Sequence, residues 1–182
     1  MLKFFSRLKI APRREIVDGR RVYHKIMQQS RLPVFYGNGL APDNYDGRME
    51  VLCLHLGLMT DALRGQGEMA EKLSQAIYDV MIADFDVALR EEGLSDTGVK
   101  RRIKPLAKMY FERAREYSEA LRTHGAKSAS FVQAVEKHLS AEKIADHKPS
   151  VDIGVYAQNF AQNLQACSLG EIAKAEFEFP KI

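Results

Sequence analysis

The feature that most constrains this chain is a helical spacing of apolar residues that recurs in one segment after another. Between Gly67 and Glu92, large apolar residues follow one another mostly at intervals of three or four: Met69, Leu73, Ile77, Val80, Met81, Phe85 and Leu89. This spacing places them on one face of an α-helix. The 182 residues include only 12 Gly and 6 Pro, so tight turns are few and an all-β architecture is disfavoured.

The same spacing predicts helices along most of the chain. They span residues 14–30, 48–63, 67–92, 96–122, 130–139 (with an extension to 144 left open) and 149–167, and the tail from residue 171 adds one turn before Pro180. Residues 33–47 are predicted to be a loop, because five Gly or Pro residues lie among them. We therefore expect an all-α fold, a compact single-domain bundle of about six to seven helices.

Two local features refine these expectations. Asp96 is a good N-cap, because its carboxylate can accept hydrogen bonds from the first amides of a helix. Pro105 either kinks the helix that contains it or starts a second segment. Gly93 is the expected C-terminal stop of the helix over 67–92.

The charge of the chain is unevenly distributed. The net charge is +3, but residues 1–31 contain nine Lys or Arg and two acidic residues, so they carry +7 and the remainder −4. We expect a basic arm over residues 1–13 and a helical domain over 14–182. Such an arm is attracted to polyanions and anionic membranes, although a solvated face that binds nothing is the alternative. The residues assigned to this attraction are Lys3, Phe4, Phe5, Arg7, Lys9, Arg13 and Arg14.

No motif of a known catalytic chemistry occurs in the sequence. The chain lacks a Gly-rich phosphate loop, a His-Glu-x-x-His pair, a Gly-x-Ser-x-Gly elbow and a Cys-x-x-Cys pair. Gly65-Gln-Gly67 follows a predicted helix, so we interpret it as a helix–helix turn. Cys53 and Cys167 are interpreted as isolated thiols, with a disulfide as the alternative. We predict neither enzymatic activity nor a cofactor.

His55 is the histidine most in need of an explanation. It lies in the apolar run Leu52–Leu58, so a buried neutral imidazole with a hydrogen-bond partner is the preferred interpretation, and a metal or haem ligand is the alternative. His24 would reach it only through the tertiary fold. Asp79, Asp84 and Asp86 lack the Glu-x-x-His partners of a di-iron bundle, so we predict no metal site.

Residues 100–104 place four positive charges in the first turns of a helix, where they oppose the helix dipole. This unfavourable placement suggests a use, such as an acidic partner, ribosomal RNA or lipid headgroups. The alternative, slightly preferred, is that these cations pair with Asp86, Glu91 and Glu92 of the preceding helix. DNA is not expected as a partner, because aromatic and basic residues do not interleave.

Several ordered motifs resemble the ubiquinol–cytochrome c chaperone family. The first is Asp43–Arg48 (Asp-Asn-Tyr-Asp-Gly-Arg), followed by a helix that contains His55. The second is Gln75–Met81 followed by Asp84–Gly93, and the pattern continues over residues 96–121. The likeness covers roughly residues 20–125. The chain departs from the family pattern at Asn44, Met49, Leu94-Ser95 and Pro105.

The resemblance implies an assembly factor that binds newly made cytochrome b and promotes formation of respiratory complex III. It also implies a cytoplasmic protein at the inner face of a bacterial plasma membrane, with an anionic lipid surface or the ribosome as further partners and a second assembly factor left open. A peripheral membrane protein without a specific client is the alternative. The residues predicted to contact partners are Phe35, Tyr36, Asp46, Arg48, Arg90, Lys100, Arg101 and Lys104.

Overall fold

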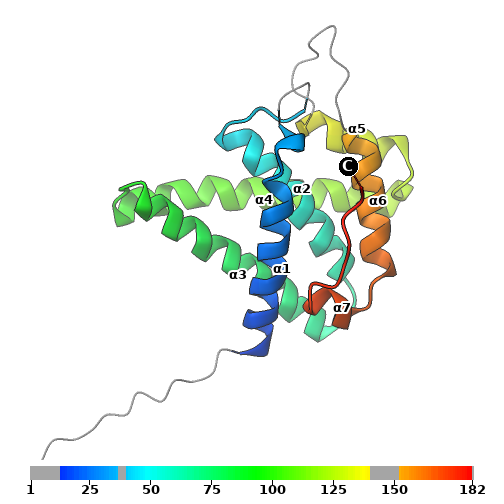
Figure 1. Ribbon diagram of the computed structural model, residues 1–182, viewed down its shortest axis with the longest axis horizontal. Helices are drawn as coiled ribbons and strands as arrows, with labels where there is room; N and C mark the ends of the chain where they lie inside the picture. Colours follow the sequence, from blue (N-terminus) through cyan, green and yellow to red (C-terminus); the bar gives the residue numbers. More distant parts are fainter. Residues whose placement is uncertain (1–12, 37–39, 140–151, 182) are drawn as a thin grey trace, which may run out of the picture.

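The described part of the chain is all-α, as the sequence predicts. The computed structural model describes residues 13–36, 40–139 and 152–181. Within these ranges the only β-type pairing is an isolated bridge between Tyr36 and Ala41. The elements are α1 (Arg14–Ser30), the 3-10 turn η1 (Pro33–Phe35), α2 (Tyr45–Leu63), α3 (Glu68–Glu91), α4 (Asp96–His124), α5 (Ala129–Leu139), α6 (Ile153–Ala166) and α7 (Leu169–Ala173) (Figure 1).

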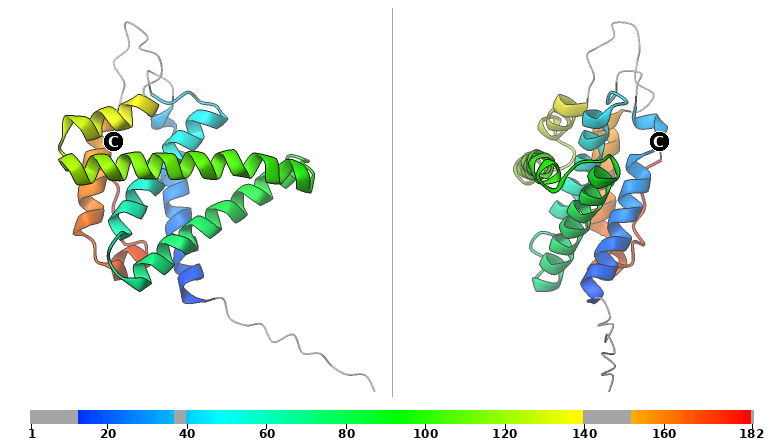
Figure 2. Two further views of the ribbon diagram at one scale, coloured as in Figure 1. Left: turned by 180° about the vertical axis from the view of Figure 1, so that it is seen from behind. Right: turned by 90° about the vertical axis from the view of Figure 1, so that its left-hand side faces the viewer.

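Helix α2 is the centre of the fold. Every residue from Val51 to Met59 is buried, so the helix has no solvent-facing side over more than two turns. It lies between α1 on one side and α4 on the other (Figure 2), and it also contacts α3, α5 and α6. Helical spacing alone predicts one apolar face, whereas this helix is apolar on all sides over these residues, as a buried helix is.

Two glycines allow the helices around this centre to approach closely. A Cβ atom on Gly19 of α1 would lie 2.8 Å from the Cβ of Ala76 on α3. A Cβ atom on Gly57 of α2 would lie 3.2 Å from the Cα of Ala114 on α4. The ion pair between Glu50 and Arg113, with N–O distances of 2.7 and 2.6 Å, holds α2 and α4 together beside the second crossing.

Helices α3 and α4 form a long hairpin that diverges from a tight turn (Figures 1 and 2). Gly93 ends α3 with a φ of 87°, as expected for a glycine stop. The N-cap of α4 is Ser95, whose hydroxyl accepts a hydrogen bond from the amide of Gly98, so the prediction of Asp96 was wrong. Asp96 is the first helical residue and pairs instead with Arg90 of α3. Helix α4 continues through Pro105 without a second start.

Most predicted boundaries lie within a few residues of the observed ones, and the differences follow from capping groups. Helix α2 begins three residues before the predicted Arg48, because the side chain of Asn44 accepts a hydrogen bond from the amide of Gly47 at 2.9 Å. Helix α6 begins at Ile153, capped by Asp152. The start predicted at residue 149 and the extension predicted to residue 144 lie outside the described residues.

After α7 the chain runs in an extended form along α1, and we call residues 174–181 the C-terminal strap. The side chain of Lys25 donates hydrogen bonds to the carbonyl oxygens of Ala175 (2.9 Å) and Phe177. The ring of Phe177 is fully buried and packs against Phe160 of α6, with centroids 6.3 Å apart. The strap therefore joins the first helix of the bundle to one of the last.

Replacing Phe177 with alanine is expected to lower the free energy of unfolding by about 3–5 kcal/mol, because it removes a buried ring and leaves a cavity between α1 and α6. The measurement is urea unfolding followed by circular dichroism. Val155→Ala on α6 is a control, since Val155 is 47% exposed and its loss should change stability by no more than about 0.5 kcal/mol. Equal midpoints for Phe177→Ala and the unmodified chain would show that the strap does not stabilise the bundle.

Candidate functional site

An apolar groove of about 440 Å³ opens between α1, α2 and α3. Its floor is formed by Met27 from α1, Met49 and Leu52 from α2, and Phe85 and Leu89 from α3. Met49, Leu52 and Leu89 are at most 5% exposed, so the floor is continuous with the hydrophobic core. A concave surface of this size and composition is typical of sites that bind a ligand or an apolar segment.

Charged residues surround this apolar floor. Arg31 and Arg48 lie on the side of α1 and α2, and Asp84 and Glu92 on the side of α3. The guanidinium group of Arg48 lies over the ring of Tyr36 at 5.1 Å and pairs with Asp43 at 2.7 Å. The rim thus presents charges of both signs, which suits the orientation of a bound segment better than the capture of a simple ion.

Tyr36 of the groove lining, and Tyr23, which bonds the lining residue Asp84, are neutral and held by hydrogen bonds. Burial raises the pKa of Tyr36 to about 12, with Arg48 acting in the opposite direction, and its hydroxyl donates to the carbonyl oxygen of Ser30. Tyr23 donates to the carboxylate of Asp84 at 2.7 Å, and burial raises its pKa well above the ordinary range. Neither of these two hydroxyl groups can therefore act as a base. We interpret the groove as a surface for binding.

The structure brings two of the predicted contact residues, Tyr36 and Arg48, together at this groove. Phe35 is 1% exposed, and its ring packs against His55 and Tyr156 at 5.4 and 5.1 Å. It therefore supports the loop from inside, and in this structure it presents no surface to a partner. Asp46 is exposed in the first turn of α2, and it does not line the groove.

The remaining predicted contacts lie on the α3–α4 hairpin, away from the groove lining. Arg90 bridges Asp86 and Asp96 and so secures the turn of the hairpin. Lys100, Arg101 and Lys104 are exposed on α4. Among the described residues none of these three forms an ion pair, so the preferred expectation that they pair with the acids of α3 was wrong.

Of the residues assigned to the basic arm, only the last two fall within the described ranges. Arg13 is the N-cap residue of α1, and Arg14 is the first residue of the helix, with an ion-pair distance of 3.7 Å to Asp18. Both side chains are exposed. Lys3, Phe4, Phe5, Arg7 and Lys9 lie outside the described residues.

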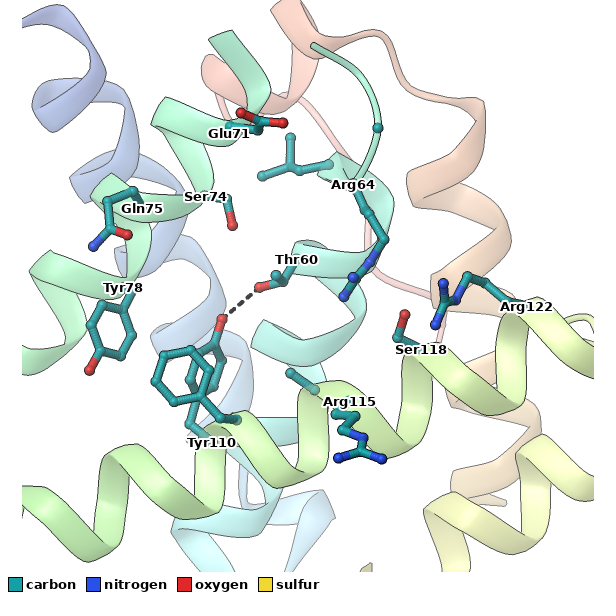
Figure 3. A pocket seen from close by; sticks show the side chains of 14 residues that line it. Thr60, Arg64, Glu71, Ser74, Gln75, Tyr78, Tyr110, Arg115, Ser118 and Arg122 are labelled. Carbon is teal, nitrogen blue, oxygen red and sulfur yellow. Dashed lines mark hydrogen bonds between the residues drawn. The ribbon is translucent and has the colours of Figure 1, made fainter. Parts of the chain in front are cut away.

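A second cleft, of about 470 Å³, lies between the end of α2 and the diverging helices α3 and α4 (Figure 3). Thr60 and Tyr110 share a hydrogen bond of 2.7 Å in this cleft, and Arg64 and Arg122 point toward one another at its other end. Arg64 lies 3.7 Å from Asp61, and Arg115 pairs with Glu119. With much of its charge compensated and a polar wall, this cleft suits an apolar segment less well than the groove does.

His55 lies in the core beneath the groove and is fully buried. Its Nδ1 lies 2.8 Å from the carbonyl oxygen of Val51, which can only accept, so Nδ1 carries the proton. Nε2 then accepts a hydrogen bond from the hydroxyl of Tyr156 at 2.8 Å, and that hydroxyl accepts from Gln29 at 3.1 Å. This chain of hydrogen bonds joins α1, α2 and α6.

The surroundings of His55 support a packing role. Burial lowers its pKa to about 4, although the bond to Val51 acts in the opposite direction. Because both ring nitrogens are engaged, no lone pair is directed at an open position where a metal or haem could bind. Of the two thiols, Cys53 is buried and Cys167 is half-buried, and both are free. Within the described ranges, no group of three potential ligands could hold a metal ion.

The floor of the groove is what sequence reasoning missed. Phe85 and Leu89 lie on the apolar face predicted for the helix over residues 67–92, and such a face indicates core positions. Spacing shows that these residues face inward, but it does not show where the neighbouring helices separate. One local signal is present in the sequence, because its Gly and Pro residues predict a loop over 33–47, next to the helices that supply Met27 and Met49.

Comparisons with known proteins agree on one family. The family model described as "Ubiquinol-cytochrome C chaperone" matches residues 40–179. The crystal structure of the Cbp3 homolog from Brucella abortus is similar to this chain, with a TM-score of 0.71 and 27% sequence identity, over 92% of this chain and 91% of that one. No curated protein sequence matches the chain. Among the described helices, none has both the length and the apolar character that crossing a bilayer requires.

His55 should make stability depend on pH. The unfolded chain takes up a proton at an ordinary pKa near 6.5, whereas the folded protein does so only near 4, so acid favours the unfolded state. Between about pH 6.5 and 4 the free energy of unfolding is expected to fall by about 3 kcal/mol from this group. Urea unfolding at a series of pH values measures it.

His55→Gln is the comparison, because it keeps a donor and an acceptor but cannot titrate. The difference in stability between the two proteins should shrink as the pH falls through this window. A constant difference would show that His55 does not remain neutral in the folded protein.

Proposed function

We propose that this chain, which belongs to the ubiquinol-cytochrome C chaperone family, is an assembly factor that binds newly made cytochrome b and promotes formation of respiratory complex III. Family membership is the observation that carries this proposal, since the model matches most of the helical domain. The similarity to the Cbp3 homolog from Brucella abortus extends over nearly the whole of both chains and supports it.

The groove between α1, α2 and α3 is the surface we assign to the client. Before assembly, an apolar segment of a membrane protein has no partner for its apolar side chains, and water exposure costs about 25 cal/mol per Å² of their surface. Met27 and Phe85 are half-buried and can repack around different side chains, as flexible and aromatic groups do in other helix-binding grooves. The charged rim would orient the segment.

The proposed activity is binding without catalysis. Several titratable groups at the groove are engaged in pairs, such as Tyr23–Asp84 and Arg48–Asp43. A chaperone of this kind needs a reversible apolar contact and a means of release, and assembly of the client into the complex would provide the release by covering the same surface.

The proposed location is the cytoplasm, at the inner face of a bacterial plasma membrane. The exposed residues Lys100, Arg101 and Lys104 on α4, together with the basic arm, would hold the chaperone close to the membrane or the ribosome, and a second assembly factor remains a further proposed partner. The competing function is peripheral membrane binding without a client. The exposed cations support both functions, whereas the groove supports only the binding of a client.

Ala88→Arg tests the groove directly. Ala88 is an exposed lining residue of the groove, so the substitution places a charge among apolar walls without disturbing the core. Recovery of cytochrome b by the tagged chaperone from detergent-solubilised membranes is expected to fall about tenfold or more, the effect of about 1.4 kcal/mol of binding energy. Complementation of a deletion strain, read as assembled complex III, should fail in parallel.

Ala83→Arg is the matched control. It makes the same change on the same helix, at an exposed position that does not line the groove. It should recover cytochrome b normally and restore complex III. Normal recovery by Ala88→Arg would exclude the groove as the client site, and normal complex III in the deletion strain would exclude the proposed function.

A further inference from the structure

We infer that the exposed basic side of α4, which borders the second cleft, is the surface by which this protein docks on an anionic membrane leaflet. This inference rests on the proposed function for its biological setting, and on the geometry of α4 for its physical content. The inference assigns the attraction to anionic membranes to a defined surface on the folded domain, whereas the sequence assigned it to the basic arm.

Five of the cations of α4 lie along one side of the helix. With 3.6 residues per turn, Lys100, Lys104, Lys108, Arg115 and Arg122 fall within a sector of about 80°. All five are exposed. They extend along most of a helix of 29 residues, which crosses the molecule as a long rod (Figure 2). We call these five residues, with Arg101 beside them and Phe111 among them, the α4 ridge.

The charge of the ridge is only partly compensated. Lys108 lies 3.7 Å from Glu112, and Arg115 pairs with Glu119 at 2.7 Å. In the part of the chain that the structure describes, Lys100 and Lys104 have no acidic side chain within ion-pair distance. The ridge therefore keeps a net positive charge, although residues 32–182 as a whole carry −4.

This concentration of charge is unfavourable for the isolated domain. Cations in the first turns of a helix oppose its dipole, and like charges four residues apart repel one another. An anionic surface would offset both effects at once, because it is attracted to each cation and lies parallel to the helix.

Phe111 distinguishes a membrane from other anionic partners. Its ring packs against Tyr78 of α3, with centroids 5.1 Å apart, at the edge of the second cleft, but it is still 54% exposed and falls in the same sector as the cations. An aromatic ring flanked by basic residues suits the boundary between headgroups and acyl chains. Binding of single-stranded RNA would favour several interleaved aromatic residues, and the ridge has one. A flat bilayer can also touch a straight helix along its whole length.

The test uses the full chain and vesicles of phosphatidylcholine, with and without phosphatidylglycerol. The variant carries Lys100→Gln, Lys104→Gln and Lys108→Gln. Each basic residue near an anionic surface strengthens binding about fivefold. The partition of the triple variant onto vesicles with phosphatidylglycerol should therefore fall about 100-fold. The matched control carries Lys72→Gln, Lys127→Gln and Lys174→Gln, three exposed lysines elsewhere with the same change in net charge.

A spectroscopic arm reports on the orientation of the bound protein. The chain contains no Trp, so Phe111→Trp introduces a single reporter. Its fluorescence should shift to the blue on anionic vesicles and stay unchanged on phosphatidylcholine alone. The control is Val155→Trp on α6, at an exposed position outside the ridge, which should not shift.

Equal loss of binding in both triple variants would overturn the inference, as would binding without a shift at Phe111→Trp. Loss of binding on deletion of residues 1–12, with no effect of the ridge variants, would assign the membrane to the arm instead. Binding of ribosomal RNA in place of vesicles would also overturn it. Recovery of the client from detergent-solubilised membranes involves no bilayer. A negative result in the vesicle experiment therefore contradicts only the role of the α4 ridge, and a negative result in the recovery experiment contradicts only the role of the groove.

Discussion

The structure depends on covering a helix that cannot face water on any side. From Val51 to Met59, α2 is buried in every direction, and a helix of this kind is stable only when others surround it. Helix α4 approaches α2 closely because Gly57 has no side chain to hold the two helices apart, and Gly19 likewise lets α1 approach α3. The hydrogen bonds of His55 satisfy the one strongly polar side chain in this buried stretch.

Surrounding one helix with several others also explains the groove. The loop between α1 and α2 and the divergent course of α3 leave one side of the first half of α2 incompletely covered. Met49 and Leu52 there belong both to the core and to an accessible surface. A bundle assembled around a uniformly apolar helix will expose some of it wherever its neighbours separate, and in this protein that exposure is bordered by charges of both signs.

The helices were predictable because their apolar spacing is regular, and α1 matches its predicted bounds of residues 14–30. The sequence did not predict that Ser95, and not Asp96, is the N-cap of α4. Adjacent polar residues compete for the capping position, and Arg90 attracts the carboxylate of Asp96. Arg48 belongs to a motif of the sequence and Tyr36 to an aromatic pair in the predicted loop, and both line the groove. The sequence alone does not show whether Phe85 lies in the core or on the floor of the groove, because both environments select the same apolar side chains. The tertiary structure shows which one it is.

The C-terminal strap has a consequence for how the protein is made. Lys25 and the carbonyl of Ala175 are 150 residues apart in the sequence, and at translation rates of about 5–20 residues per second the second emerges roughly 8 to 30 s after the first. Tyr156, which completes the hydrogen bonds of His55, also emerges late. During that interval α1, α3 and α4 can already cover α2, but α6 and the strap are still missing from the fold. A member of a chaperone family thus passes through a stage in which its own core is incompletely covered.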